Sequence, residues 1–302
     1  MKEEANFADF VNRFNTEETC RDHFFKIRWP NGFRCPKCSN EEYSFLKSYG
    51  RYQCRKCGHQ ASITAGTIMH KAHTGLREWF WAAFLFTHEG GISAAQIARN
   101  VGISKYTILL MLHKLRKAMR DRDAKYYLDG IVEMDDAFFG APGEDSKRGR
   151  GTEKTPAVIA MSLNEEGHPE HVKMQVVENV DGATIVGMAK ETIAPGATIN
   201  TDGLSAYNAL NEAGYKHNSE KFDPENNPQH LHWLHVIISN LKALITGTYH
   251  GLDKKHLQRY FDEYCWRFNR RRFGNQLFNR LLEACTSATT ITYAQLVGSE
   301  PA

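Results

Sequence analysis

The chain lacks any apolar run long enough to cross a lipid bilayer. A membrane helix needs about 20 consecutive, largely apolar residues, and no run here reaches about 18. The charged N-terminal stretch MKEEANFADFVNRF also lacks the apolar core of a secretory signal. We therefore expect a protein of the cytoplasm that has no membrane partner.

The chain also has few cysteines outside one cluster. Cys20, Cys265 and Cys285 are scattered, whereas the other four of the seven lie between positions 35 and 57. A disulfide framework is typical of small secreted domains and spreads its cysteines through them. The distribution found here instead indicates a reducing compartment and one metal site.

The clustered cysteines form two pairs, Cys35-x2-Cys38 and Cys54-x2-Cys57, with 15 residues between them. Each pair can hold one side of a tetrahedral ion, and four thiolates leave no coordination position open. The pattern therefore predicts a structural zinc ion, whereas a redox dithiol would need only one pair. The short hairpins expected here have almost no apolar core, so zinc binding would supply their folding free energy.

Acidic residues are missing from one long segment: positions 226–252, 27 residues in all, contain no Asp or Glu. The helix predicted within it, HWLHVIISNLKALI, therefore offers no carboxylate. Any metal chemistry on this helix must use another kind of side chain.

Hydropathy and turn patterns divide the chain into parts of different character. Short helices are followed by alternating, Gly-broken stretches that are typical of small hairpins, then by two helical segments, then by alternating strand and helix patterns. The predicted architecture is a multidomain α+β protein: N-terminal helices (1–30), a zinc ribbon (31–70), a helix-turn-helix domain (75–125) and an α/β domain (130–290).

The segment ISAAQIARNVGISKYTILLMLHKLRKAMR has the pattern of a helix-turn-helix. Gly102 falls at the turn, and Ser104 can cap the second helix. That helix would present Lys105, Tyr106 and Thr107 near its N-terminal end, where a recognition helix meets base edges. The alternative is a helical linker domain without a DNA-binding role.

Positive charge is concentrated in two segments. Residues 101–125 carry seven Lys or Arg and two acids, and residues 250–280 carry eight and three. Such clusters suit a polyphosphate backbone, and the KRGRG segment (147–151) is interpreted as another basic loop. The alternatives are solvated helix faces and, for Glu263 and Arg267, an i,i+4 pair that stabilises the last long helix.

Three acids lie at predicted strand ends of the α/β part. Asp135 and Asp136 are placed at the end of the strand in GIVEMDDAFFG, and Asp202 follows a second strand in ATINTD. Alternation puts Asp135 and Asp136 on opposite faces, so only one can point into a given site, and the sequence does not decide which. Carboxylates at neighbouring strand ends can bind two divalent ions for phosphoryl transfer. For any single acid, a turn or cap role is the alternative.

The segments VEMDDAFFG, KRGRGTEKTPAVIAM, NTDGLSAY and GTYHGLDKKHLQRYFDEYCWRFNRR, with the zinc ribbon and the helix-turn-helix, resemble insertion-sequence DDE transposases. The resemblance covers roughly residues 15–295 and is greatest to the zinc-ribbon-bearing "fifteen-ninety-five" family, with its ISXO-like transposase domain. It implies an RNase H-like catalytic domain, Mg²⁺-dependent DNA strand cleavage and strand transfer, and binding to terminal inverted repeats. Asp135, followed here by Asp136, matches the family's first acid, and Asp202 matches the second.

The family's third acid lies on a helix, seven residues before a Lys or Arg. Here the residue seven positions before Lys242 is His235, so the sequence departs from the three-carboxylate pattern. Related subgroups resemble this chain, with His or Asn in place of Glu. A neutral imidazole can ligate a divalent ion; a general-base or packing role for His235 is the alternative. Lys242 would contact a DNA phosphate or lie solvated at the surface.

Helix geometry bears on the same choice. At 100° per residue, an apolar stripe has His235 and Lys242 on one edge and Asn240 on the other. His235 is therefore preferred as the third metal-site residue, with Asn240 as the alternative. The stripe consists of Leu234, Ile237, Ile238, Leu241 and Ile245.

Together with these patterns, the resemblance implies a transposase, a polynucleotidyl transferase acting on double-stranded DNA. We expect a structural Zn²⁺ ion, and catalytic Mg²⁺ or Mn²⁺ held by Asp135, Asp202 and His235. Transposon ends and target DNA would be the partners, bound at the nucleoid by a homodimer or larger assembly because two ends must be processed together. One alternative is a catalytically inactive, transposase-derived DNA-binding protein, which the missing Glu favours. The other is a zinc-ribbon transcription factor.

Overall fold

A computed structural model describes residues 6–88, 90–140, 154–249 and 252–298 of the chain. The chain forms two compact units, residues 1–122 with 273–302 (unit 1) and residues 123–272 (unit 2), and each is described by itself. Among the described residues, no helix is both long and apolar enough to cross a membrane. The KRGRG segment (147–151), interpreted above as a basic loop, lies outside these residues.

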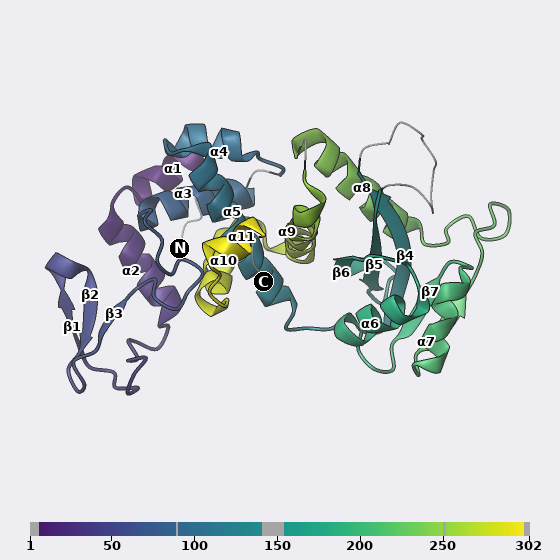
Figure 1. The fold of residues 1–302 in the computed structure, drawn as a ribbon, viewed down its shortest axis with the longest axis horizontal. Coiled ribbons are helices and arrows are strands. Elements are labelled where there is room, and N and C mark those ends of the chain that lie inside the picture. The colour runs from purple at the N-terminus through teal and green to yellow at the C-terminus, as the bar shows by residue number, and fades with distance from the viewer. Residues whose placement is uncertain (1–5, 89, 141–153, 250–251, 299–302) are drawn as a thin grey trace. The chain divides into compact units, whose positions relative to one another are not determined.

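Unit 1 combines helices with a small three-stranded sheet (Figure 1). The sheet is antiparallel with strand order β1-β2-β3, as predicted for hairpins around the cysteine pairs. The principal elements are α1 (Phe7–Arg13), α2 (Glu17–Arg28), β1 (Tyr43–Leu46), β2 (Arg51–Cys54), β3 (Gln60–Ser62), α3 (Leu76–His88), α4 (Ala94–Val101), α5 (Lys105–Asp123), α10 (Leu277–Ser287) and α11 (Tyr293–Val297).

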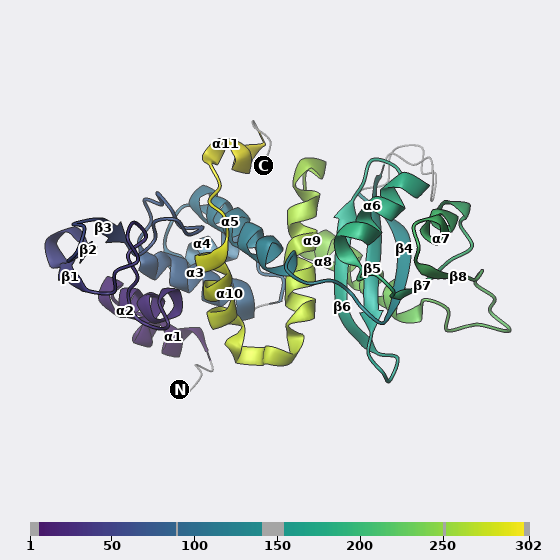
Figure 2. The same ribbon diagram turned by 90° about the horizontal axis from the view of Figure 1, so that it is seen from below.

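A cluster of aromatic rings holds the helices of unit 1 together. Phe10 of α1 stacks on Phe84 of α3 with ring centroids 4.0 Å apart, and it contacts the edge of Phe278 at 4.8 Å. Phe278 belongs to α10, which packs against α2 and α3 (Figure 2). The core of unit 1 is therefore built from both ends of the sequence.

Helices α4 and α5 form the predicted helix-turn-helix. Ser93 and Gln96 cap α4 reciprocally, and Gly102 ends it with φ 78°, a left-handed conformation that glycine adopts at little cost. The backbone N–H of Thr107 donates to the Ser104 hydroxyl at 3.1 Å, so Ser104 caps the start of α5 as predicted. Four apolar side chains of this segment are buried: Ile92, Ile97, Val101 and Ile108.

Unit 2 is built on a mixed five-stranded sheet of order β6-β5-β4-β7-β8. Strands β4, β5 and β6 pair antiparallel, whereas β4, β7 and β8 run parallel. The sheet elements are β4 (Ile131–Phe139), β5 (Thr155–Leu163), β6 (Pro169–Val176), β7 (Thr198–Thr201) and β8 (Lys216–Ser219). The main helices are α6 (Gly182–Thr192), α7 (Ala209–Glu212), α8 (His232–Thr248) and α9 (Leu257–Asn269).

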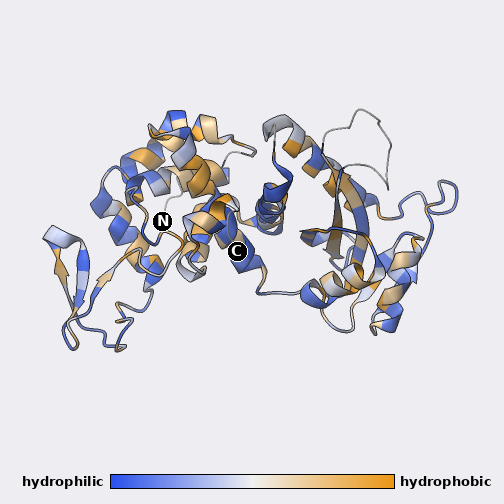
Figure 3. Ribbon diagram, in the orientation of Figure 1, coloured by the Kyte–Doolittle hydropathy of each residue, from blue (hydrophilic) through white to orange (hydrophobic). Residues whose placement is uncertain are grey.

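The helices of unit 2 cover the two faces of this sheet. One apolar core joins Val132 and Met134 of β4 to α6, and the other joins Ala137 and Phe139 to α8 and α9. The hydrophobic residues along the central strand β4, coloured orange in Figure 3, fit this double cover. The predicted stripe of α8 packs into the second core, with four members buried and Ile245 partly buried. That expectation is confirmed.

Two details of unit 2 differ from the sequence-based expectation. Strand β4 runs on to Phe139, which pairs with Thr155, so Asp135 and Asp136 lie within the strand and not at its end. The aromatic residues after the acids favour continued pairing with β5. Residues 203–214 (GLSAYNALNEAG), whose sequence pattern predicts one helix, form only a 3₁₀ turn (Ser205–Asn208) and the short α7.

Candidate active site and zinc site

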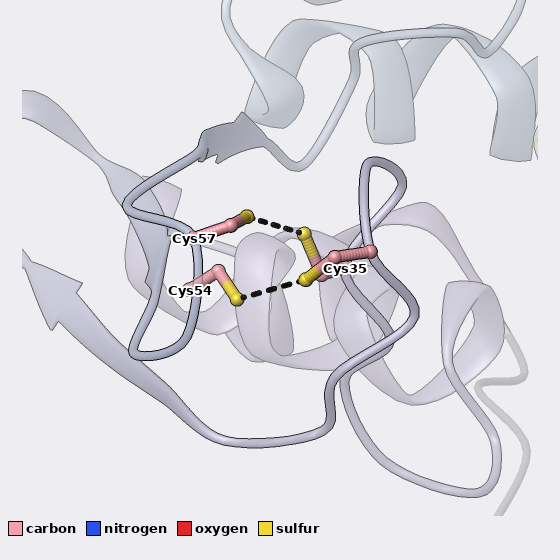
Figure 4. Close-up of side chains that lie close together, drawn as sticks. Cys35, Cys54 and Cys57 are labelled. Carbon is pink, nitrogen blue, oxygen red and sulfur yellow. Dashed lines mark hydrogen bonds between the residues drawn. The ribbon is translucent and has the colours of Figure 1, made fainter.

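The four clustered cysteines converge on one point of unit 1. The Sγ atoms of Cys35 and Cys57 lie 3.6 Å apart, as do those of Cys38 and Cys54 (Figure 4). Zinc–sulfur bonds of about 2.3 Å in a tetrahedron place the sulfurs about 3.8 Å apart. The cluster therefore fits a structural zinc ion.

Local backbone turns set up this arrangement. The amide of Ser39 donates to the carbonyl of Cys35 at 2.9 Å, and the amide of Gly58 donates to that of Cys54 at 3.0 Å. Ser39 and Gly58 have φ of 59° and 67°, so each Cys-x2-Cys pair closes in a left-handed turn. Each turn brings the two thiols of its pair to the same side.

The second site begins with the pairing of β4 and β7 in unit 2. These strands are parallel, and their last pair is Met134 with Thr201. Asp135 and Asp202 are therefore next in register on adjacent strands and start on the same face of the sheet. The amide of Leu204, two residues after Asp202, donates to Asp202 Oδ1 at 3.1 Å and so restrains this carboxylate.

Strand alternation separates the two neighbouring acids of β4. Asp135 lies on the same face of β4 as Ala137 and Phe139, and α8 covers that face. Asp136 lies on the same face as Met134, and α6 covers that one. The Nε2 atom of His235 on α8 lies 3.2 Å from Asp135 Oδ2. The amide of Asp136 donates to the other oxygen of Asp135 at 2.8 Å. Of the two acids, Asp135 is thus the one in contact with His235.

The environment of His235 is strongly acidic. Its hydrogen bond with Asp135 raises the pKa of the imidazole, burial lowers it, and the charges of Asp135, Glu133 and Asp202 raise it. The charges of three carboxylates therefore act on this one histidine. Glu133 was not among the site residues predicted from the sequence, although period-2 alternation from Asp135 puts it on the same face.

An open groove of about 410 Å³ lies beside this pair. Lys242, two turns along α8 from His235, reaches it with its Nζ 5.5 Å from the centre of the Phe139 ring. Burial, and then the positive charge of Lys154, lower the pKa of Lys242, whereas Asp135 raises it. The groove is lined by Asp135, Asp136, Ala137, Phe138, Lys154, His235, Ile238, Ser239 and Lys242.

The structure does not bring every candidate residue into one cluster. Asn240 is exposed on α8 and is not among the groove residues. Asp202 also lies outside the groove lining. Within the described ranges, the only group of three or more His, Cys, Asp or Glu side chains whose ligand atoms all lie within 4.8 Å is the cysteine quartet. Asp135, Asp202 and His235 are neighbours, but not at metal-ligand spacing.

Several cations in the two basic segments are engaged inside their own unit. Arg116 of α5 is 1% exposed, with its guanidinium 5.3 Å from the Phe86 ring centre. In unit 2, Arg267 Nε lies 3.0 Å from Glu263 Oε1, and Arg270 forms a buried 2.6 Å ion pair with Asp123. These three side chains pack or pair internally, and contact of the two basic segments with DNA stays a prediction for their remaining cations.

Two family models match the chain. A transposase zinc-ribbon domain matches residues 15–60, and an ISXO2-like transposase domain matches residues 127–269. Both models are of the IS1595 family, and together they cover more than half of the chain. The chain belongs to the IS1595 transposase family. The four-cysteine cluster lies in the matched zinc ribbon, and Asp135, Asp202 and His235 lie in the matched transposase domain.

Two curated relatives of this transposase have related descriptions. An uncharacterized protein in transposable element ISH50 of Halobacterium salinarum is 26% identical over 221 residues, covering 67% of this chain and 72% of the relative. An uncharacterized transposase-like protein of Haemophilus influenzae is 26% identical over 106 residues, covering 34% and 84%.

Among solved structures, matches include a pre-cleavage Mos1 transpososome and a Mos1 transposase paired-end complex with the left transposon end. The identities are 13% and 12%, the TM-scores are 0.25 and 0.27, and 65% of this chain is covered in both cases. The matches cover 73% and 75% of the Mos1 chains. At these scores the likeness does not establish a shared fold.

Proposed function

We propose that this transposase cleaves and joins DNA strands at the terminal inverted repeats of an insertion sequence. The observation that supports this most directly is the placement of Asp135 and Asp202 at matching positions of β4 and β7, with His235 of α8 at 3.2 Å from Asp135. Two strand carboxylates and one helix side chain occupy the positions that the family resemblance assigns to the three catalytic groups. Unit 2 would then be an RNase H-like domain, which its mixed sheet with helices on both faces supports.

The donor set suits a hard divalent cation. Asp135 and Asp202 offer carboxylate oxygens, and His235 offers an imidazole nitrogen. Asp135, Asp202 and His235 would hold Mg²⁺ or Mn²⁺, and such ions activate a water or 3′-hydroxyl and stabilise the leaving oxygen of phosphoryl transfer.

The remaining groove residues would bind and orient the DNA. Lys242 presents an ammonium group two turns from His235, and Lys154 lines the same groove. A point charge of this kind suits a phosphate oxygen. Binding the backbone there would place a phosphodiester beside Asp135 and His235.

Unit 1 would supply recognition of the transposon ends. Lys105 and Tyr106 are exposed at the start of α5, the second helix of the helix-turn-helix, where base edges would be read. The zinc ribbon would add a second DNA contact. Because two ends must be joined in one reaction, we propose a homodimer or larger assembly on DNA.

The test is strand transfer in vitro with a duplex that carries the inverted repeat found beside the coding sequence, in Mg²⁺ and in Mn²⁺. Wild type, His235→Ala, Asn240→Ala, Asp135→Asn and Asp136→Asn are compared. Loss of activity in His235→Ala and Asp135→Asn, with Asn240→Ala and Asp136→Asn much less affected, supports the proposed site. Loss in Asn240→Ala alone would contradict it.

The same experiment decides about the second candidate function, a DNA-binding protein without catalysis. The absence of a preformed carboxylate cluster at metal-ligand spacing among the described residues favours this candidate. A wild-type protein that binds the repeat but cuts nothing in either metal would make it the function.

A further inference from the structure

Asp202 of the proposed site directly follows β7, and two hydroxyl groups hold its main-chain carbonyl. The hydroxyl of Thr201, the last residue of β7, donates to the Asp202 carbonyl at 2.9 Å. The hydroxyl of Ser219, the last residue of β8, donates to the same carbonyl at 3.0 Å. Thr201 and Ser219 are paired across the two strands. A carbonyl oxygen has two lone pairs, so both bonds can form together and restrain the peptide group that follows Asp202.

A histidine on β8 extends this contact. The Nε2 atom of His217 lies 2.8 Å from the hydroxyl oxygen of Thr201, which is fully buried. The Nδ1 atom of the same ring lies 3.2 Å from the side-chain amide nitrogen of Asn211 on α7. Burial lowers the pKa of His217 below its usual 6.5, so the ring is neutral near pH 7.

The directions of these hydrogen bonds follow from one another. The amide nitrogen of Asn211 can only donate, so Nδ1 of the neutral ring accepts and the ring proton is on Nε2. That N–H donates to the Thr201 oxygen, and the single hydroxyl proton of Thr201 goes to the Asp202 carbonyl. A hydroxyl that accepts one hydrogen bond is a stronger donor in the next. A hydrogen-bond chain of one polarity therefore runs from α7 through β8 to the backbone of Asp202.

The carboxylate of Asp202 is restrained separately, because the amide of Leu204 donates to its Oδ1 at 3.1 Å. The peptide group after Asp202 and one oxygen of its side chain are thus both held. We infer that His217 and Thr201 are positioning residues that fix the Asp202 backbone and thereby direct its carboxylate into the proposed site. They act through the peptide group and not on the reacting atoms. The catalytic consequence rests on the proposed function, whereas the hydrogen-bond chain does not.

The alternative role of this chain is purely structural. Strand β8 is an edge strand of the sheet, and the contact between His217 and Thr201 also ties it to β7. That role would change the stability of unit 2 without a specific effect on the rate of the chemical step.

Four variants of the full-length chain distinguish the two roles. Thr201→Val removes the hydroxyl and keeps the size of the side chain. His217→Phe keeps a ring but has no donor, whereas His217→Gln keeps an N–H that can donate to Thr201. Thr198→Val, the same substitution at the first residue of β7, is the matched control.

Three readouts are compared. The first is kcat and KM for strand transfer in Mn²⁺. The second is the NMR signal of the Gly203 amide in metal-free protein, because this N–H belongs to the same peptide group as the Asp202 carbonyl. The third is the nitrogen NMR signal of the His217 ring, identified by its absence in His217→Gln, which shows which ring nitrogen carries the proton.

The positioning role predicts a graded result. In Thr201→Val we expect kcat to fall by about 10- to 100-fold, as for other residues that orient a metal ligand, with KM little changed and the Gly203 signal shifted. His217→Phe should change both in the same direction but less, because the Thr201 hydroxyl remains. His217→Gln should retain most of the rate and a near-native Gly203 signal, and Thr198→Val should match wild type. The wild-type ring should carry its proton on Nε2.

The outcomes separate this inference from the proposed function. A His217 proton on Nδ1 would overturn the inference, because Thr201 would then donate to the ring and not to Asp202. An unshifted Gly203 signal in Thr201→Val would overturn it whatever the activity, and so would equal rates in Thr201→Val and Thr198→Val with an active wild type. If Thr201→Val does not fold, equal Gly203 signals in His217→Phe and His217→Gln would overturn it.

An inactive wild type gives a different result. If it transfers no strands, yet the ring proton is on Nε2 and the Gly203 signal shifts in Thr201→Val but not in Thr198→Val, the proposed function fails and the positioning of Asp202 stands.

Discussion

His235 and Asp135 are 100 positions apart in the sequence and lie 3.2 Å apart between Nε2 and Oδ2. The contact joins the first turns of α8 to the middle of β4. The Asp135 side chain is 14% exposed and the His235 side chain 53%, so the ring partly covers the carboxylate while keeping access to solvent. A DNA strand in the adjacent groove would meet the histidine before the acid.

The histidine should set the metal preference of the reaction. An imidazole brings no negative charge and is softer than a carboxylate, which weakens Mg²⁺ relative to Mn²⁺. We expect strand transfer to need less Mn²⁺ than Mg²⁺, and His235→Glu to lower the Mg²⁺ requirement roughly tenfold, equivalent to about 1.4 kcal/mol. Rates measured across a range of each metal test this. Equal activity of wild type in the two metals at low concentration would contradict ligation by His235.

Zinc should be required for the ribbon and not for unit 2. Cys54→Ser removes one of four thiolate ligands, so the bound zinc and the fold of residues around β1, β2 and β3 should be lost together. Metal analysis and NMR spectra of the purified protein measure both. Cys20→Ala, a buried cysteine outside the cluster, should keep its zinc. Full zinc content in Cys54→Ser would show that the quartet is not the binding site.

Phe278 should be essential for the stability of unit 1. It is 5% exposed and meets the rings of Phe10 and Phe80 at 4.8 and 5.3 Å. Phe278→Ala should lower the free energy of unfolding by about 3–5 kcal/mol, the usual cost of such a cavity. Phe273→Ala, at a position 38% exposed, should cost far less. Urea unfolding followed by tryptophan fluorescence compares them, and similar losses in the two variants would contradict the packing described.

His171 should make unit 2 less stable in mild acid. Burial has the largest effect and lowers the pKa of this histidine below its usual 6.5. The charge of Glu170 raises the pKa but does not offset the burial. The unfolded chain then binds the proton more readily, so stability is full above about pH 6.5 and is lost as the pH falls through 6.5 toward the folded pKa. His171→Gln should therefore show a smaller loss of stability between pH 7.5 and 5.5 than wild type.

Urea unfolding at the two pH values measures this difference. His168→Gln, at an exposed position of the same unit, controls for the substitution itself. An identical pH dependence in wild type and His171→Gln would contradict the prediction.

The sequence was most informative where a local pattern carries the structure. Cysteine spacing predicted the quartet, and the Gly102 turn with Ser104 predicted the α4–α5 junction. The stripe of α8 predicted which edge of that helix carries His235 and Lys242. Each of these depends on residues within a few turns of one another, so a short window of sequence contains the signal.

The features that the sequence did not predict depend on contacts between residues that are distant in the sequence. Whether Asp135 or Asp136 faces α8 is set by strand register, which the local pattern leaves open. The burial of Arg116 and Arg270 follows from partners on other elements, Phe86 and Asp123.

The return of α10 to unit 1 has a consequence for how the chain is made. Residues 1–122 emerge from the ribosome long before Phe278 is synthesised. Until then, the aromatic side chains of α1, α2 and α3 lack their packing partner on α10. Unit 2, formed from one continuous stretch, can fold during that interval. Unit 1 is therefore completed last, although its first residues are synthesised first. Until α10 has been synthesised, its incomplete aromatic core is exposed to aggregation and proteolysis.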